Sequence, residues 1–141
     1  MKKRRVFRIG LAIILFIVTL TLYNQFTEVE LIYNSNKKSE IQISSEELIS
    51  LFHENENRAN SVFVGKMIEA KGIIKKITYQ NDTFTIFLKG ENESSYVICV
   101  MQTDQHSNVN QMVLGQSIVL KGICKGFLND VIFFGCIIVK S

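Results

Sequence analysis

The sequence feature that most constrains the fold is a change of hydrophobic period at Gly65. Before it, apolar residues from Ser44 to Val64 recur at the spacing of one helix face. After it, apolar residues fall in short runs that alternate with polar ones, which is typical of strands with one buried face. We therefore predict a small, mainly β domain with a helix at its start.

The predicted helix begins after Ser44, because Ser44 and Glu47 have the spacing of a capping box. Glu46 and Glu47 also place two carboxylates at the positive end of the helix dipole. We expect the apolar face of this helix to cover an open end or a face of the β domain. That face consists of Leu48, Leu51, Phe52, Ala59 and Val62.

Five strands are predicted after Gly65, separated by glycine or by polar residues suited to turns. Gly72 interrupts the long first strand, where a barrel strand must bend. A short helix is predicted at Asn108–Met112, and five strands with a helix after the third match the OB-fold, a small Greek-key barrel. The strands are expected at Met67–Tyr79, Thr83–Leu88, Tyr96–Met101, Ser117–Cys124 and Val131–Val139.

Alternation within these strands predicts which side chains face the barrel interior. In the second, third and fourth strands one parity is apolar. In the last strand both parities are apolar, so both of its faces need cover, and the N-terminal helix is the nearest candidate. The expected interior residues are Phe84, Ile86, Leu88, Val97, Cys99, Met101, Ile118, Leu120 and Cys124.

The N-terminal region has the pattern of a membrane anchor. Residues 1–8 carry five basic side chains, and residues 9–23 form an uncharged apolar run that Val6 and Phe7 lengthen toward the ~20 residues of a transmembrane helix. No small-residue cleavage site follows the run, which favours an uncleaved anchor over a cleaved secretory signal. The positive-inside rule then predicts a single-pass protein of the cytoplasmic membrane, with the N-terminus inside and the C-terminal domain periplasmic or extracellular.

These patterns divide the chain into four regions. Residues 1–8 are the cytoplasmic N-terminus, residues 9–23 the transmembrane anchor, residues 24–43 a linker, and residues 44–141 the OB-fold-like domain. The fold class is therefore mainly β, a five-stranded OB-fold-type barrel with an N-terminal helix, preceded by a transmembrane helix.

The charge of the domain argues against nucleic acid as its partner. The formal net charge of +3 depends on the N-terminal tip, because from Glu28 onward 11 basic residues face 13 acidic ones, a net charge of −2. Tight binding to a phosphate backbone usually needs a basic surface. We expect a non-catalytic binding or assembly module for an envelope protein, peptide or glycan, with a single-stranded nucleic-acid-binding protein as the alternative.

The expected ligand-binding residues follow from the usual contact region of OB-folds, which is the surface of the second and third strands with the adjoining loops. On the outward parity of those strands, and in the loop between the fourth and fifth, aromatic, aliphatic and polar side chains are available for contact. The candidates are Phe87, Tyr96, Ile98, Lys125, Phe127 and Asn129.

The three cysteines allow one intramolecular disulfide in an oxidising compartment. If the last two strands form a hairpin centred on Asp130, Cys124 and Cys136 lie opposite one another and could be bonded. The alternative is three buried free thiols. The sequence has neither a Cys-x-x-Cys metal motif nor a Gly-x-Ser-x-Gly elbow, so no metal site, cofactor or enzymatic activity is expected.

Short sequence words in the domain resemble those of a known family in order and spacing. They are Glu47-Leu48, Phe52, Asn55-Glu56, Ala59, Gly65-Lys66, Lys71-Gly72, Cys99, Gly115–Gly122, Cys124 with Gly126-Phe127, and Cys136. The family is the tRNA-anticodon-binding-like (tRNA_anti-like) family of bacterial envelope proteins. The resemblance runs from about Ser44 to Ile138. It implies an OB-fold and assigns no catalytic residues to this chain. Met101 stands where the family often has an aromatic residue, which weakens any inferred stacking site.

Overall fold

The computed structural model describes residues 14–19, 39, 41–90 and 94–139. The chain forms two units, of which the first contains a helix at residues 14–19 and the second contains the β domain. Most of the predicted anchor and linker, and all of residues 1–8, lie outside the described residues. Within the described ranges, no helix combines the length and the apolar character needed to cross a bilayer.

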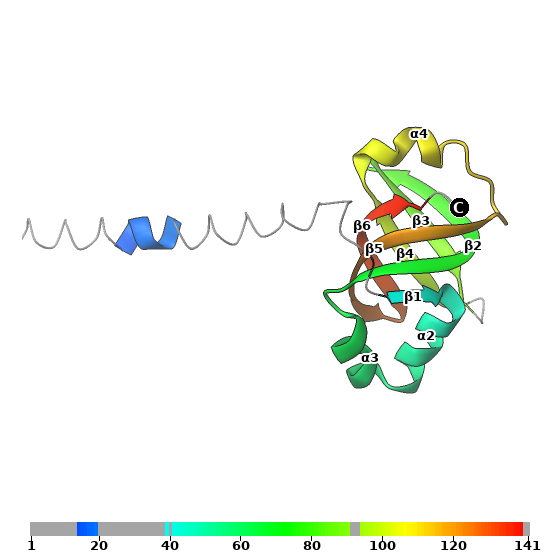
Figure 1. The fold of residues 1–141 in the computed structure, drawn as a ribbon. Coiled ribbons are helices and arrows are strands. Elements are labelled where there is room, and N and C mark those ends of the chain that lie inside the picture. The colour runs from blue at the N-terminus through cyan, green and yellow to red at the C-terminus, as the bar shows by residue number, and fades with distance from the viewer. Residues whose placement is uncertain (1–13, 20–38, 40, 91–93, 140–141) are drawn as a thin grey trace, which may run out of the picture. The chain divides into compact units, whose positions relative to one another are not determined.

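Among the described residues, the β domain contains six strands, two helices after the first strand and two short helical turns between the fourth and fifth strands (Figure 1). In chain order they are β1 (Ile41–Ser44), α2 (Ser45–Glu54), α3 (Glu56–Phe63), β2 (Met67–Gln80), β3 (Thr83–Lys89), β4 (Tyr96–Met101), η1 (Thr103–Gln105), α4 (His106–Val109), β5 (Ser117–Leu128) and β6 (Asp130–Ile138).

Strands β2 to β6 form a closed barrel with the order β2-β3-β4-β6-β5, and the pairing of β2 with β5 closes it. Strands β4 and β6 are parallel, while the other neighbours within the barrel are antiparallel. This is the five-stranded OB-type barrel that the sequence predicts. The predicted strands are confirmed, although β5 continues to Leu128, four residues beyond its expected end.

The long strand β2 serves two partners, and Gly72 lies next to the point where it changes between them. Residues 67–73 pair with β5, and residues 74–80 pair with β3. A Cβ atom at Gly72 would collide with the Ser45 hydroxyl oxygen and with Leu88. The glycine therefore lets the start of α2 approach the barrel closely, where Ser45 Oγ donates a hydrogen bond of 2.5 Å to the Lys89 carbonyl.

Strand β1 was not predicted and shortens the linker. It pairs in parallel with β2, with Ile41 opposite Ile68 and Ser44 opposite Lys71. Residues 41–43, which the prediction assigned to the linker, belong to the sheet. Four residues are too few for alternation to identify a strand, and the pairing depends on β2, which is distant in the sequence.

The predicted single helix is two helices that meet at Asn55. The Ser44 hydroxyl accepts a hydrogen bond of 3.1 Å from the Glu47 amide, which confirms the predicted N-cap. Asn55 ends α2 and caps α3 by accepting a 3.0 Å hydrogen bond from the Arg58 amide. Because α3 starts a new helical phase, Phe63 is buried in place of the predicted Val62, which is 37% exposed.

The barrel interior agrees with the predicted alternation in β3, β4 and β5. Of the nine predicted interior residues, eight are buried and Phe84 packs on the core while partly exposed. Strand β6 departs from the prediction, because its inward residues are Val131, Phe133 and Cys136. A register shift against β4 at Gly135, whose φ is +62°, changes the parity there. Phe134 faces outward and is 49% exposed, so the expected cover over both faces is absent at this position.

The helical segment between β4 and β5 starts earlier than the predicted Asn108–Met112. It consists of η1 at Thr103–Gln105 and α4 at His106–Val109. Neither turn has a hydrogen bond from a capping side chain, so no local signal marks where the helix begins. Val109 is buried and attaches the segment to the core.

Candidate functional site

The outward face of the barrel carries a row of mostly apolar side chains across four adjacent strands. Strand register places Lys76 of β2 beside Phe87 of β3, Phe87 beside Ile98 of β4, and Ile98 beside Ile132 of β6. Lys76 is exposed, and the other three side chains are partly exposed. We call these four residues and the adjacent Tyr96 the outer band.

Contacts within the outer band hold its aromatic rings in defined orientations. The Phe87 and Tyr96 rings meet edge to face, with centroids 6.0 Å apart and an interplanar angle of 86°. The Lys76 ammonium lies 5.3 Å from the Phe87 ring centroid, within cation–π distance. The outer band therefore offers an apolar surface with one cation at its β2 side, which suits an extended partner with apolar side chains.

Asp130 fixes one end of the outer band. Its carboxylate accepts a hydrogen bond of 2.7 Å from the Tyr96 amide, which joins the first residue of β4 to the first residue of β6. A backbone amide that donates to a carboxylate forms a charge-assisted hydrogen bond, stronger than a neutral one. The position of Tyr96 is thus set by the backbone as well as by its ring contact.

The structure separates the six predicted binding residues into two groups. Phe87, Tyr96 and Ile98 lie together in the outer band, as expected from the parity of β3 and β4. The other three belong to the β5–β6 hairpin: Lys125 and Asn129 are exposed, and Asn129 forms the tip with a φ of +68°.

Phe127 is a packing residue of the helical end of the barrel. Its ring stacks on Phe52 with a centroid distance of 5.3 Å and an interplanar angle of 17°, and the His53 ring meets it edge-on at 5.1 Å. The side chain is partly buried and packs on the core. Its contacts with α2 place it outside the outer band.

The sequence did not single out Lys76 and Ile132 as surface candidates, nor Leu128 and Phe134 as exposed apolar residues. Lys76 and Ile132 are brought to the outer band by long-range register, which no local pattern contains. Leu128 is 80% exposed beside the hairpin tip. It lies four residues beyond the predicted end of the fourth strand, in a segment that we expected to be a loop. In the last strand both alternating sets of positions are apolar, and this pattern was the sequence signal that Ile132 and Phe134 could lie on the outer face.

A serine and a histidine that are far apart in the sequence meet in the structure. His53 Nε2 and Ser95 Oγ are 3.1 Å apart. A histidine in contact with a serine hydroxyl is one requirement of nucleophilic catalysis. However, Ser95 is 5% exposed, and within the described ranges no carboxylate is hydrogen-bonded to His53. The pair ties α2 to the β3–β4 connection.

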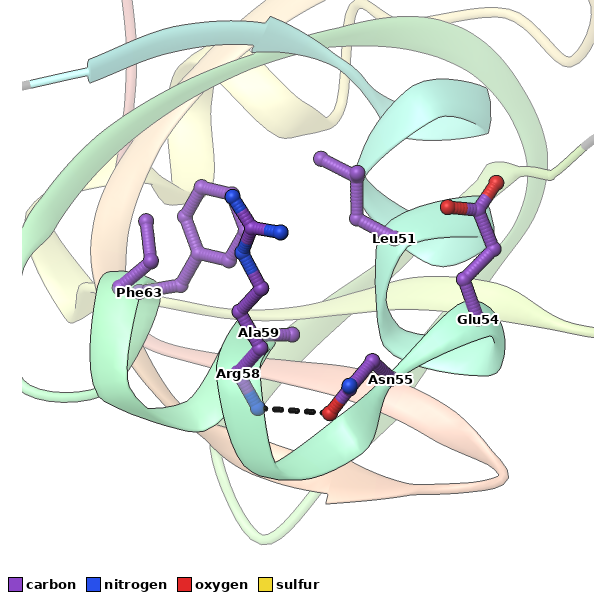
Figure 2. A pocket seen from close by; sticks show the side chains of 7 residues that line it. Leu51, Glu54, Asn55, Arg58, Ala59 and Phe63 are labelled. Atoms are coloured by element: carbon purple, nitrogen blue, oxygen red, sulfur yellow. Dashed lines mark hydrogen bonds between the residues drawn. The ribbon is translucent and has the colours of Figure 1, made fainter.

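A groove of about 330 Å³ lies between α2 and α3 (Figure 2). Leu51, Ala59 and Phe63 supply its apolar lining, and Glu54 and Arg58 bring opposite charges to it. Figure 2 shows the side chains of Leu51 and Arg58 directed into the space between the helices. The Asn55–Arg58 capping hydrogen bond forms the turn at one end of the groove.

The three cysteines are buried free thiols. The predicted Cys124–Cys136 disulfide requires these two residues to lie opposite one another, and the register does not place them so. The register that this prediction assumed is wrong. The hairpin turns at Asn129, and a register shift between Cys124 and Gly126 places Cys124 opposite Phe133. Burial raises the pKa of Cys124 to about 11, partly offset by a backbone hydrogen bond from Gly126, so this thiol is neutral at pH 7. A neutral thiol is a poor nucleophile.

Within the residues that the structure describes, no group of three or more histidine, cysteine, aspartate or glutamate side chains is arranged to hold a metal ion. The outer band offers hydrophobic, aromatic and cationic contacts. These contacts suit recognition of a partner.

Comparison with known proteins identifies the fold and a family. The model of the tRNA_anti-like family matches residues 1–138. No curated protein sequence matches the chain. A crystal structure from Klebsiella pneumoniae, described as that of a candidate nucleic acid-binding lipoprotein, has a TM-score of 0.60 at 16% identity, covering 71% of this chain and 92% of that one.

Two further structures are less similar. An OBody bound to hen egg-white lysozyme has a TM-score of 0.46 at 11% identity, covering 57% of this chain and 87% of that chain. An asparaginyl-tRNA synthetase from Entamoeba histolytica has a TM-score of 0.42 at 15% identity, covering 55% and 21%. At 16% identity the Klebsiella structure shows a shared fold.

Proposed function

Since this chain belongs to the tRNA_anti-like family, we propose that it is a non-catalytic binding or assembly module held at the outer side of the cytoplasmic membrane. Its outer band contacts an envelope protein, peptide or glycan. The single observation that carries the proposal is the in-register row of Lys76, Phe87, Ile98 and Ile132 on the outward face of the barrel. The residues on either side of each apolar member of this row are fully buried.

The composition of the outer band favours an apolar partner. Each strand of the closed barrel is paired on both sides. The apolar side chains of the band nevertheless remain partly exposed at Phe87, Ile98 and Ile132. A grouped set of apolar side chains on a solvent-facing sheet is a common mark of an interaction surface. Tyr96 adds a ring with a polar hydroxyl, a side chain that is enriched at interfaces.

Two features of the N-terminal region support the proposed location at the membrane. Five basic residues precede the apolar run at 9–23, and residues 14–18 of that run are helical with exposed apolar side chains. Exposed Ile14, Leu15 and Phe16 fit a lipid environment better than water. A reporter fused after Ser141 tests this part separately: activity only outside the membrane is expected, and activity in the cytoplasm would refute the proposed topology.

Site-specific photocrosslinking tests the proposed surface in cells that produce the full-length chain. A photoreactive phenylalanine analogue in place of Ile98 should capture an envelope component, because Ile98 lies at the centre of the outer band. The matched control places the analogue at Val113, which is 66% exposed outside the band. Capture from position 113 equal to that from position 98 would refute the assignment of the surface.

Introducing a charge into the outer band sharpens the same test. Ile98→Glu puts a carboxylate into the apolar row and should weaken capture, measured from a probe at position 87, by more than ~tenfold. Val113→Glu should leave capture unchanged. Thermal unfolding of both variants verifies that the barrel is folded.

Binding of single-stranded nucleic acid is the second candidate function. It is favoured by the edge-to-face pair of Phe87 and Tyr96, since bases stack on such rings, and by the description of the Klebsiella protein. The net charge of −2 from Glu28 onward weighs against it. A salt-dependent gel shift with short oligonucleotides, lost in Phe87→Ala, would establish this function in place of the first.

A further inference from the structure

The groove between α2 and α3 has apolar walls that the domain leaves partly uncovered. The two helices separate at Asn55, which ends α2 and caps α3. Leu51 is partly buried and Val62 is 37% exposed, although both belong to the predicted apolar face. Together with Phe63 they line the groove of about 330 Å³ (Figure 2). A partner can therefore bury apolar surface here without disturbing the core.

This groove continues along α2 into a second hollow of about 460 Å³. Leu51 and Glu54 line both hollows and so form the boundary between them. The second hollow is lined mainly by polar side chains, and three of these are the exposed carboxylates of Glu46, Glu47 and Glu54. The two hollows, which we call the extended groove, thus place an apolar surface beside an anionic one.

The carboxylate of Glu54 lies where it does not stabilise its own helix. Glu46 and Glu47 are in the first turn of α2, where negative charge compensates the helix dipole. Glu54 is the last residue of α2, at the negative end of the dipole, where a carboxylate is unfavourable. The Ser50 hydroxyl donates a hydrogen bond of 3.5 Å to this carboxylate, and both residues line the second hollow. Helix stability therefore accounts for Glu46 and Glu47 but not for Glu54.

Arg58 gives the extended groove a direction. Its side chain points into the space between the helices, so the α3 side of the groove carries a positive charge (Figure 2). The α2 side carries the three carboxylates. A cation of a partner is attracted to the α2 side and repelled from the α3 side. The charges therefore favour a cationic partner and set its orientation.

We propose that the extended groove is a docking site for a cationic segment of a partner protein, in which lysine or arginine residues flank large apolar side chains. The apolar side chains pack on Leu51, Val62 and Phe63. The flanking cations pair with the three carboxylates of α2. Exposed ion pairs contribute little affinity, so the apolar contact is needed for binding while the charges provide selectivity. None of these residues belongs to the outer band, and the docking site is independent of the proposed function.

Peptide binding to the full-length chain in a non-ionic detergent tests the proposal. The probe is a fluorescent peptide, Lys-Lys-Leu-Phe-Lys-Lys with blocked termini, and its fluorescence anisotropy at low salt measures the dissociation constant against micelles without protein. We expect at least ~tenfold weaker binding of Glu-Glu-Leu-Phe-Glu-Glu, which has the opposite charge, and of Lys-Lys-Ser-Ser-Lys-Lys, which lacks the apolar side chains. Equal binding of either peptide, or no binding of the probe, would overturn the proposal.

Removing single carboxylates locates the site on the protein. Glu54→Gln should weaken binding of the probe by about threefold to fivefold. Glu56→Gln is the matched control, because Glu56 is exposed on α3 and lines neither hollow. Its effect should stay below ~twofold. Equal weakening by the two substitutions would mean that the probe responds only to net charge, and would overturn the docking site.

Arg58→Gln should have the opposite sign, because it removes the cation from the α3 side. Binding of the probe should become about twofold to threefold tighter, and unchanged or weaker binding would overturn the proposal. Ile98→Ser, in the outer band, should leave binding of the probe unchanged, whereas a loss would place the probe on that band instead. Thermal unfolding verifies that each variant is folded. Should Glu54→Gln fail to fold, the peptide series and the sign of the Arg58→Gln effect decide the question.

Discussion

The two ends of the barrel are closed by helical segments of different construction (Figure 1). At one end, α2 and α3 each begin with a side-chain cap, from Ser44 and Asn55. The ring of Phe52 on α2 packs against that of Phe63 on α3, with centroids 5.9 Å apart, and against that of Phe127 on β5, with centroids 5.3 Å apart. Local capping and a buried aromatic group act together at this end.

The opposite end is covered by η1 and α4, which lack side-chain caps. There His106 meets Phe84 and Tyr79 edge-on at 5.0 Å and 5.7 Å, but Tyr79 is 52% exposed. His106 Nε2 is buried without a hydrogen-bond partner among the described residues. From this contrast we expect the two ends to differ in local stability, with the α2–α3 end the more stable.

The largest expected effect compares equivalent aromatic truncations at the two ends. Phe52→Ala should lower the free energy of unfolding by about 3–5 kcal/mol, because it removes a fully buried ring and leaves a cavity. Phe84→Ala should lower it by only about 1–2 kcal/mol, because that ring is partly exposed. Urea denaturation measures both. Equal losses would remove the proposed difference between the ends.

Capping should contribute less than the aromatic packing. Asn55→Ala should lower the free energy of unfolding by about 1 kcal/mol, since the Arg58 amide loses its acceptor. Ser107→Ala, in the exposed surface of α4, should change it by less than ~0.5 kcal/mol. A Ser107→Ala effect as large as that of Asn55→Ala would show that α4 depends on polar contacts as well.

A smaller effect is expected from alkaline pH acting on Cys124. The pKa of this thiol is about 11 in the folded state and 9.0 in its ordinary state. Between these pH values the unfolded chain loses the proton and the folded chain keeps it. The stabilising contribution is therefore complete below pH 9 and declines as pH rises toward 11.

Cys124→Ala provides the comparison for this pH effect. Under reducing conditions, its stability should decline less steeply than that of the unsubstituted chain from pH 9 to 11, as measured by urea midpoints at each pH. Identical slopes would mean that the Cys124 thiol is as acidic in the folded chain as in the unfolded one.

The smallest expected effect lies at the β2–β3 turn. The Tyr79 hydroxyl donates a hydrogen bond of 2.9 Å to the Asp82 carboxylate, which raises the pKa of Tyr79. Asp82→Asn removes the negative charge and should move this pKa back toward 10.0 with no measurable loss of stability. Phenolate absorbance during an alkaline titration measures the change, and Tyr79→Phe identifies the signal. An unaltered titration would indicate that the turn leaves the hydroxyl in water.

Much of the fold could be predicted because its signals are local. The Ser44 cap, the five barrel strands and eight buried interior positions depend on residues that lie within a few positions of one another. The break at Asn55 was also present locally as an asparagine suited to capping. It was missed because the apolar stripe continued across it.

The candidate site could be predicted only in part for the same reason. Phe87, Tyr96 and Ile98 follow from strand parity, and the structure keeps them together. Phe127 has the same residue character, yet its ring is committed to Phe52 and α2, because the β5–β6 hairpin folds toward the helices. Neither the Lys76 contact with Phe87 nor the His53–Ser95 pair has a local sequence signal.

By itself, the sequence determined the class of the domain, the barrel strands and most of their inward side chains, because hydrophobic periodicity is written in neighbouring residues. Only the tertiary structure decided which strand residues face one another. A single extra residue at Gly135 reverses the parity of β6 and places Cys136 opposite Met101. Register between distant strands depends on such bulges and on closure of the barrel, and both are properties of the assembled sheet.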